Sequence, residues 1–300
     1  MAGAGERIVA IRAGVLLLLF VVSVLVYLPQ NGFAILGQTA GLGTQACEEG
    51  HLCVYYFDVG QGDATFIESP TGTQVLIDGG PDGSVLRELG TVMGYLDKSI
   101  DVMIATHPDK DHIGGLIDVL ERYEVLAIVR TENESDTSAW KQLERLAVEE
   151  GADIVYARRG QVYDIGGGVE LEVLFPDRDP SGMESNASSI VMRLTFGGTS
   201  FLFTGDSPKS IEEYLVLVEG ERLMSDVLKV GHHGSRTSTS ELFLAEVDPR
   251  YAVMSFGEGN TYGHPHVEVT DALFNYDVET HTTAKEGTIE IRSNGTEITF

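Results

Sequence analysis

From about residue 51 onward the sequence alternates short β-rich runs with segments of helical spacing, and this alternation occurs twice. In the first half, β-rich runs lie at 52–60, 64–69, 74–80, 101–107 and 125–130, and helical segments lie at 84–96, 114–123 and 136–151. In the second half, β-rich runs lie at 153–157, 169–175, 188–196, 199–205, 225–231, 251–256, 287–293 and 296–300, with helical segments at 208–218 and 238–247. Parallel neighbours in a sheet need helical crossovers and hairpins do not, so the mixture predicts two mixed sheets packed face to face with helices outside.

The N-terminus carries an uncharged apolar stretch, Ala13 to Leu28, preceded by Arg7 and Arg12. Its length lies between that of a signal-peptide core and that of a spanning helix. We expect a retained membrane anchor, with a cleaved signal segment or a buried helix as alternatives. Arginines before the stretch favour a cytoplasmic N-terminus and an outward-facing domain. The predicted organisation is a cytoplasmic segment (1–12), an anchor or signal (13–28), a tether (29–50) and one domain (51–300).

The chain has a formal net charge of −26, and its cations are 14 arginines and 6 lysines. An excess of carboxylates with few lysines suits a surface exposed to high salt, where charge repulsion is screened, so a salt-loving source is expected. The same charge argues against a broad basic surface for duplex nucleic acid. A phosphate substrate would therefore be held locally, by metal ions and loop amides.

Two cysteines, Cys47 and Cys53, lie in the stretch CEEGHLC. In an oxidising compartment such a pair is expected to form a disulfide that closes a short loop. A zinc site that includes His51 is the alternative.

The stretch THPDKDHIGG, from Thr106 to Gly115, places His107, Asp109, Asp111 and His112 within six residues between a β-rich run and a helix. Loops at strand ends are where metal sites are commonly built, because rigid elements aim the side chains. Gly114 and Gly115 allow close approach of another backbone segment. Taken alone, the stretch fits a metal site or an exposed acidic turn.

Two later β-rich runs also end in residues that bind metals. Asp206 follows FLFTG, and His232 and His233 follow VLKVG. Asp206 alone fits a helix N-cap, and the two histidines alone fit an ordinary turn. Three ligand-bearing turns after three β-rich runs instead predict that the turns converge on one metal centre.

These motifs resemble those of the metallo-β-lactamase superfamily, and more closely the extracellular domain of the ComEC competence proteins. The matching stretches, in order, are FDVGQGDATFI, LIDGG, THPDKDHIGGL, NASSIVMRLTFGGTSFLFTGD, LKVGHHGS and YGHPH, and they are spread across the region from Tyr55 to His266. The resemblance implies a four-layer αββα sandwich of the α/β class and a hydrolase with two divalent metal ions.

The resemblance also implies a set of metal ligands: His107, Asp109, Asp111, His112, Asp206, which bridges the two ions, and His232, with His233 as the less favoured alternative. The wider superfamily has a second histidine where this chain has Asp109, and its separate later histidine ligand is missing. Imidazole and carboxylate ligands together suit Zn²⁺ and Mn²⁺, and an oxygen at Asp109 favours the harder ion. The metal is therefore predicted as zinc or manganese.

Further residues are predicted to support the ligands or contact the substrate: Asp58, Gln61, Asp63, Asp78, Asn186 and Ser188. Asp78 resembles an aspartate that orients the ligand loop in the superfamily. The alternative, an aspartate that caps the turn, involves the same hydrogen bonds to nearby backbone amides. His264, in YGHPH, is the best candidate for donating a hydrogen bond or a proton to the substrate. Asp111 and His264 are the residues predicted to be catalytic.

The predicted function is metal-dependent hydrolysis of phosphodiester bonds outside the cytoplasm, with nucleic acid as the substrate and a link to DNA uptake or processing. DNA uptake would need a separate translocation channel as a partner. The alternatives are a hydrolase of envelope polymers or small phosphodiesters, a lactam or thioester hydrolase, and a metal-stabilised binding module without turnover. The superfamily fold by itself does not choose among them.

Overall fold

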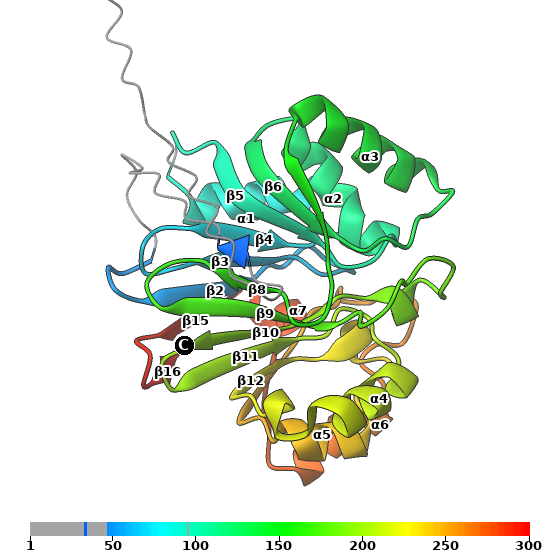
Figure 1. Ribbon diagram of the computed structural model, residues 1–300. Helices are drawn as coiled ribbons and strands as arrows, with labels where there is room; N and C mark the ends of the chain where they lie inside the picture. The colour runs from blue at the N-terminus through cyan, green and yellow to red at the C-terminus, as the bar shows by residue number, and fades with distance from the viewer. Residues whose placement is uncertain (1–32, 35–46, 95) are drawn as a thin grey trace, which may run out of the picture.

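The computed structural model describes residues 33–34, 47–94 and 96–300 and contains two eight-stranded sheets packed face to face (Figure 1). The first sheet has the strand order β16 (Ile298–Thr299), β15 (Ile289–Ser293), β2 (Leu52–Tyr56), β3 (Thr65–Glu68), β4 (Gln74–Ile77), β5 (Ser99–Ala105), β6 (Glu124–Arg130) and β7 (Asp153–Tyr156). Its strands β4 to β7 are parallel, and β16 to β4 are antiparallel. The PTGT turn joins β3 and β4, which pair as an antiparallel hairpin.

The second sheet has the strand order β1 (Phe33–Ala34), β8 (Val162–Asp164), β9 (Val169–Phe175), β10 (Val191–Phe196), β11 (Thr199–Phe203), β12 (Val227–Lys229), β13 (Tyr251–Met254) and β14 (Glu279–Thr282). Its strands β11 to β14 are parallel. Each sheet thus has a parallel half whose strands are connected through helices.

The helices cover the outer faces of the two sheets (Figure 1). On the first sheet lie α1 (Ser84–Val92), α2 (Lys110–Leu120) and α3 (Ser138–Glu150), and on the second lie α4 (Lys209–Glu219), α5 (Glu241–Val247) and α6 (Val267–Asn275). A one-turn helix, α7 (Thr283–Glu286), follows β14. The order of layers is helices, sheet, sheet, helices, as predicted.

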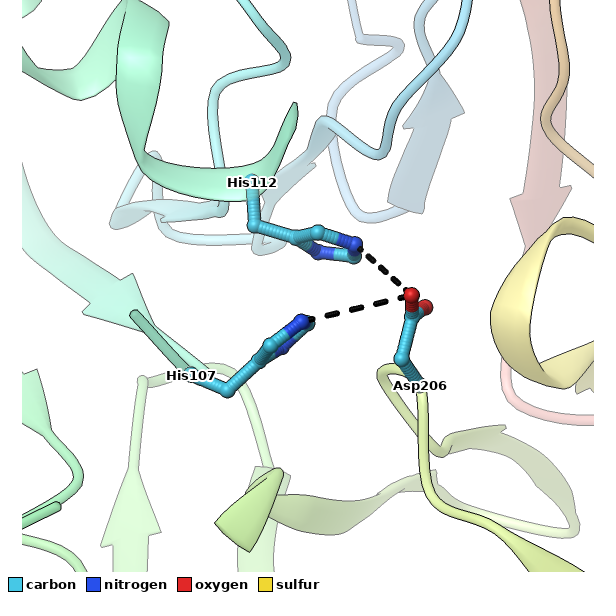
Figure 2. A group of neighbouring side chains, drawn as sticks. All are labelled: His107, His112 and Asp206. Atoms are coloured by element: carbon cyan, nitrogen blue, oxygen red, sulfur yellow. Dashed lines mark ion pairs between the residues drawn. The ribbon is translucent and has the colours of Figure 1, made fainter. Parts of the chain in front are cut away.

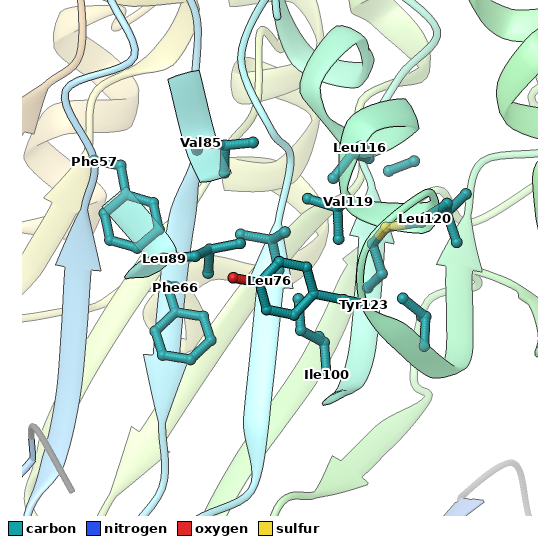
Figure 3. Close-up of a cluster of buried hydrophobic side chains, with 14 of the residues drawn as sticks. Phe57, Phe66, Leu76, Val85, Leu89, Ile100, Leu116, Val119, Leu120 and Tyr123 are labelled. Atoms are coloured by element: carbon teal, nitrogen blue, oxygen red, sulfur yellow. The ribbon is translucent and has the colours of Figure 1, made fainter. Parts of the chain in front are cut away.

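Alternation of side chains along the strands explains the layers. In β2, Leu52, Val54 and Tyr56 belong to the apolar core between the sheets, whereas Cys53 and Tyr55 belong to the core beneath α1 to α3. Successive side chains of a strand point to opposite faces, so a strand that is buried on both faces is apolar throughout. Figure 3 shows the helix-side core, where aromatic and aliphatic side chains of the first sheet meet those of α1 and α2.

The predicted helix boundaries differ from the structure at α1, which ends at Val92 and not at residue 96, and at α2. Helix α2 begins at Lys110 and not at residue 114, so Asp111 and His112 lie in its first turn. Thr137 caps α3 by accepting a hydrogen bond from Trp140 N. Gly151 ends α3 in the left-handed conformation. Helix α6 and strand β14 were not predicted, because exposed apolar side chains such as Phe274 and Tyr276 blur their patterns.

The predicted cytoplasmic segment and membrane segment, residues 1–12 and 13–28, lie outside the described residues. In the part of the chain that the structure describes, no helix has both the length and the apolar character needed to cross a bilayer. Within the predicted tether, β1 pairs in parallel with β8. Cys47 and Cys53 form the predicted disulfide, so their sulfur atoms are not free to bind zinc with His51.

Candidate metal centre

The carboxyl ends of parallel strands from both sheets meet at one edge of the sandwich. Asp78 follows β4 and His107 follows β5 in the first sheet, while Asp206 follows β11 and His233 follows β12 in the second. Contacts between His107 and Asp206 show that the two edges adjoin. The sandwich therefore brings together residues that are about 100 positions apart in the sequence.

Asp206 lies at the centre of this cluster. Its Oδ2 atom is 3.3 Å from His112 Nε2 and 4.0 Å from His107 Nε2. Figure 2 shows both histidine rings directed toward this carboxylate. The same oxygen is 3.5 Å from His233 Nε2. All four residues are almost completely buried. Ser189, which the sequence analysis did not identify, holds Asp206 in place because its Oγ accepts a hydrogen bond from Asp206 N at 3.1 Å.

The three buried imidazoles share one arrangement: Nδ1 is anchored and Nε2 faces the cluster. Nδ1 of His107 lies 3.0 Å from Thr106 Oγ1, that of His112 lies 2.8 Å from Asp78 Oδ2, and that of His233 lies 3.0 Å from the Ser255 carbonyl oxygen. The Nε2 atom of each ring and Asp206 Oδ1 are buried and make no hydrogen bond. Buried polar atoms are nearly always paired, and an anchored Nδ1 is typical of histidines that bind metal through Nε2.

The donor atoms fall into three overlapping groups that fit a divalent cation. These groups are His107, His112 and Asp206; Asp111, His112 and His233; and Asp63, Asp206 and His233. Within each group the donor atoms lie within 4.8 Å of one another. Nitrogen and carboxylate oxygen are the donors that Zn²⁺ and Mn²⁺ accept, so the residues fit a metal centre.

The electrostatics of the cluster favour positive charge at its centre. Burial lowers the pKa of His233, but the carboxylates of Asp206 and Asp63 outweigh burial and raise that pKa to about 10. Burial likewise disfavours the charged form of His112, yet Asp206 and Asp78 raise its pKa well above the usual value. For Asp206, burial raises the pKa, but the charges of His112, His233 and His107 and the hydrogen bond with His112 together lower it well below its usual value. Protons on the imidazoles or divalent cations can supply this positive charge.

Asp78 orients the loop that carries the ligands. Its carboxylate accepts hydrogen bonds from Thr106 N at 2.9 Å and from Thr106 Oγ1 at 2.7 Å, in addition to its contact with His112. Its φ of 57° is unusual for a residue other than glycine, so the fold holds it in a strained conformation. The buried Asp78 carboxylate thus holds the stretch from Thr106 to His112 at both of its ends.

The geometry favours His233 over His232, the reverse of the order predicted. His233 is buried, and its Nε2 lies 3.3 Å from Asp111 Oδ2. The His232 side chain is 26% exposed, its Nε2 is 3.7 Å from Asp206 Oδ2, and it belongs to none of the donor groups found in the described part of the chain. Both residues have a left-handed backbone, with φ of 48° and 55°, which turns the two rings in different directions.

Asp109 and Asp111 lie on the solvent side of the cluster, with side chains 45% and 38% exposed. Asp109 Oδ2 is 3.8 Å from His107 Nε2, and Asp109 Oδ1 accepts a hydrogen bond from Ser185 Oγ at 2.6 Å. Asp109 does not belong to the donor groups, whereas Asp111 does. These two carboxylates mark the side from which a ligand can approach.

The GQGD turn contributes Asp63 and Gln61. Asp63 is buried between His233, whose Nδ1 is 3.2 Å from Asp63 Oδ1, and Lys229, whose Nζ is 2.7 Å from Asp63 Oδ2. Lys229 was not identified in the sequence, although a lysine inside the apolar run VLKVG indicates a buried partner. Gln61 Oε1 accepts a hydrogen bond from Gly257 N at 3.3 Å, and Asp58 binds Gly60 N within its own turn.

His264 lies beside the cluster, half-buried, with ring centroids 5.7 Å from His232 and 6.1 Å from His233. Burial and then the positive charges of His233 and His232 lower its pKa to about 4, so the ring is neutral at pH 7. Its Nδ1 is buried and makes no hydrogen bond.

The predicted residues Asn186 and Ser188 form a short turn (Asn186–Ser188). Ser188 Oγ donates to Ser185 O at 2.6 Å and accepts from Asn133 Nδ2 at 3.0 Å, so it stabilises the turn beside Asp109. Asn186 Oδ1 is buried and makes no hydrogen bond. Neither residue belongs to a donor group in the described residues.

Glu212 of α4 supports the segment that follows His233, because its carboxylate accepts hydrogen bonds from Thr239 N at 2.6 Å and Ser240 N at 2.8 Å. Burial raises the pKa of Glu212 from 4.5 to about 7, because the two hydrogen bonds lower the pKa by less than burial raises it. The folded protein therefore keeps a proton that the unfolded chain loses, and the free energy of unfolding falls as pH rises from about 4.5 to about 7.

We expect Glu212→Gln to remove this part of the pH dependence, on the order of 3 kcal/mol across the interval. Urea unfolding of metal-free protein at a series of pH values measures the slope. Glu213→Gln, on the exposed side of the same helix, is the matched control and should keep the wild-type slope. An unchanged slope in Glu212→Gln would contradict the assignment.

Comparison with known proteins agrees with the fold and the motifs. The family model described as the metallo-beta-lactamase superfamily matches residues 57–258. The chain is 32% identical to ComE operon protein 3 of Bacillus subtilis (strain 168), over 95% of this chain and 40% of that protein. It is 32% identical to Competence protein ComA of Neisseria gonorrhoeae, over 74% of this chain and 29% of that protein. It is 30% identical to Recombination protein 2 of Haemophilus influenzae, over 78% of this chain and 28% of that protein.

The chain therefore spans less than half the length of these curated relatives. Among solved structures, it is similar to CmlA, a diiron beta-hydroxylase from Streptomyces venezuelae, with a TM-score of 0.54 and 17% identity over 82% of this chain and 55% of that one. It is also similar to the metallo-beta-lactamase fold protein YhfI from Bacillus subtilis, with a TM-score of 0.52 and 13% identity over 83% of this chain and 99% of that one. These two likenesses concern the fold alone. Because the family model matches more than half of its residues, the chain belongs to the metallo-β-lactamase superfamily.

Proposed function

We propose that this protein is a divalent-metal-dependent hydrolase of phosphodiester bonds, that its substrate is nucleic acid, and that the domain works outside the cytoplasm, tethered to the membrane or secreted. The observation that carries the proposal is the set of three buried Nε2 atoms, of His107, His112 and His233, that surround Asp206 without hydrogen bonds. Such an arrangement needs positive charge at its centre, and divalent cations bound by the Nε2 atoms and by Asp206 would supply it.

Two ions, zinc or manganese, would share the ligands. His107, His112 and Asp206 form one donor group and would hold one ion. His233 Nε2, which lies 3.3 Å from Asp111 Oδ2 and 3.5 Å from Asp206 Oδ2, would hold the other ion together with these two carboxylates. Asp109 is the further carboxylate beside His107, and it would complete the first set. When bound, two such ions activate water at neutral pH and neutralise charge on a phosphate oxygen.

The protein's own residues would orient the substrate. His264, half-buried beside His232 and His233, would donate a hydrogen bond to a phosphoryl oxygen. Lys229, through Asp63, would hold His233 with its Nε2 toward the cluster. Both cysteines are joined in a disulfide, so neither offers a thiolate nucleophile.

Three observations support the choice of substrate and location. Two of the relatives are named for competence and recombination, which are processes of DNA. The disulfide suits an oxidising compartment, and the apolar stretch at 13–28 suits a membrane anchor. In a DNA-uptake role the protein would act with a separate translocation channel.

The test uses the full-length chain purified in detergent at high salt. We expect about two metal ions per chain, and hydrolysis of oligonucleotides or of a chromogenic phosphodiester that falls at least about 100-fold after chelation. Zinc or manganese should restore it, and chelated protein given calcium serves as the control. Two bound metals without hydrolysis of any phosphodiester would favour a lactam or thioester hydrolase or a binding module. Failure to bind metal would overturn the proposal.

A further inference from the structure

Residues 257–266, which lie between β13 and α6, are here called the rim loop. The rim loop carries an exposed aromatic side chain beside the metal centre. Tyr262 in the rim loop is 66% exposed. One face of its ring stacks on His264, with centroids 5.6 Å apart and planes 22° apart. The extent of exposure leaves the other face open to solvent. A large aromatic ring held in this way is a surface on which a flat ligand can stack.

Hydrogen bonds hold the rim loop in one shape. Asn260 Nδ2 donates to the carbonyl oxygens of Gly257 at 3.0 Å and His264 at 2.7 Å, and His264 N donates to Asn260 Oδ1 at 3.0 Å. Both ends of the loop are attached to the metal centre. Gly257 N donates to Gln61 Oε1, and His266 N donates to the carbonyl oxygen of Gly234, next to His233, at 2.9 Å. Tyr262 is therefore positioned before any ligand binds.

The His264 ring lies between Tyr262 and the histidines of the cluster, His232 and His233. A nucleotide whose phosphate lies at the cluster would thus have Tyr262 within reach of a neighbouring base. A base can stack on an aromatic ring without any charged side chain of the protein taking part.

The charges around the rim loop make stacking more important for binding. Two cations lie near its C-terminal end: Arg236, whose backbone N donates to His266 Nδ1 at 3.2 Å and whose guanidinium lies 3.4 Å from Glu268, and Lys209, whose charge also acts on Glu268. Glu258 is exposed in the loop itself. With a net charge of −26, the protein has no surplus of cations to follow a phosphate backbone by attraction. Contacts with the bases must then supply much of the affinity.

We infer that Tyr262 is a stacking platform for a nucleobase next to the scissile phosphate, and that the substrate is single-stranded nucleic acid. The inference rests on the proposed function, which it makes more specific. In a duplex each base is already stacked between its neighbours, so its face is not available to a side chain. An unpaired strand presents base faces freely, and an aromatic ring accepts them with little regard to sequence.

The test compares Tyr262→Ala, Tyr262→Phe and wild type in binding to nuclease-resistant phosphorothioate oligonucleotides with metal present. The probes are a single strand, the corresponding duplex, and a single strand that carries a run of abasic sites. Loss of a base stack is expected to weaken binding of the normal single strand about 5- to 100-fold in Tyr262→Ala and only slightly in Tyr262→Phe. Tyr276→Ala, which removes an exposed tyrosine at the end of α6, is the matched control and should bind as wild type does.

The abasic strand separates stacking from a merely structural role. If Tyr262 stacks on bases, wild type and Tyr262→Ala bind that strand equally weakly, because the partner of the ring is missing in both. Equal loss on the normal and abasic strands would overturn the inference, as would binding of duplex as tight as that of the single strand. If wild type hydrolyses phosphodiesters and Tyr262→Ala binds the normal strand unchanged, the inference fails and the proposed function stands. If binding of the normal strand depends on Tyr262 but wild type hydrolyses no phosphodiester, the stacking platform stands and the proposed hydrolysis fails.

Discussion

Replacing Asp206 with asparagine is expected to lower the metal content from about two ions per chain to one or none, and to lower phosphodiester hydrolysis by at least about 10³-fold. The reason is position: Asp206 Oδ2 is within 4.0 Å of the Nε2 atoms of His107, His112 and His233. Asparagine keeps the shape of the side chain but removes the charge shared by both proposed metal positions. Metal analysis of purified protein and a diester assay measure the two effects.

A matched control is available at the opposite end of the neighbouring strand. Asp226, just before β12, accepts hydrogen bonds from Ser200 N and Ser200 Oγ at 2.8 and 3.0 Å, away from the cluster. Asp226→Asn should keep both metals, although its stability falls somewhat. If Asp206→Asn binds two metals and hydrolyses at the wild-type rate, the central role given to Asp206 is wrong.

Gly115→Ala is expected to lower the free energy of unfolding by about 3 kcal/mol or more, the upper end for overpacking in a protein interior. A Cβ atom at Gly115 would lie 2.0 Å from the Gly79 carbonyl oxygen and 2.5 Å from that of Asp82. Both contacts are with backbone, which cannot rotate away as a side chain can. Because this backbone segment carries Asp78, the proposed ligand His112 should also shift and metal affinity should fall.

Gly90→Ala provides the contrast. Gly90 lies in the exposed part of α1, and a Cβ atom there would meet nothing within 4 Å. Alanine at this position should stabilise the protein by about 0.5–1 kcal/mol through helix propensity. Urea unfolding monitored by circular dichroism, with metal removed, compares the two variants. A Gly115→Ala protein that unfolds at the wild-type urea concentration would show that α2 does not pack against residues 79–82 as closely as described.

Much of the fold was predictable because its signals are local. Apolar runs that end in glycine-containing turns predicted the strands, and the mixture of hairpins and helical crossovers predicted two mixed sheets. The elements that were missed have weak local signals. Helix α6 leaves Val267 and Phe274 exposed, so its apolar pattern does not match its buried face. Helix α2 begins inside the ligand motif, where the charges of Asp109, Lys110 and Asp111 hide the helical spacing.

The buried support around the ligands was harder to predict. Lys229 pairs with Asp63 across 166 residues of sequence, and Ser189 bonds to Asp206 N across 17. Neither contact has a local pattern, because each depends on how two loops meet. The disulfide between Cys47 and Cys53, by contrast, spans six residues and was predicted from the sequence.

The sequence by itself determined which chemical groups reach the edge of the sandwich: imidazoles and carboxylates that follow apolar strands, with Gly114 and Gly115 where α2 needs close backbone contact. Only the tertiary structure decided which of these groups meet. His232 and His233 are neighbours with the same chemistry, and the direction of each ring depends on two left-handed backbone conformations after β12. Those conformations are set by contacts with segments distant in the sequence, such as the hydrogen bond from His232 N to the Gly205 carbonyl oxygen. The turn therefore buries His233 against Asp206 and leaves His232 partly exposed to solvent.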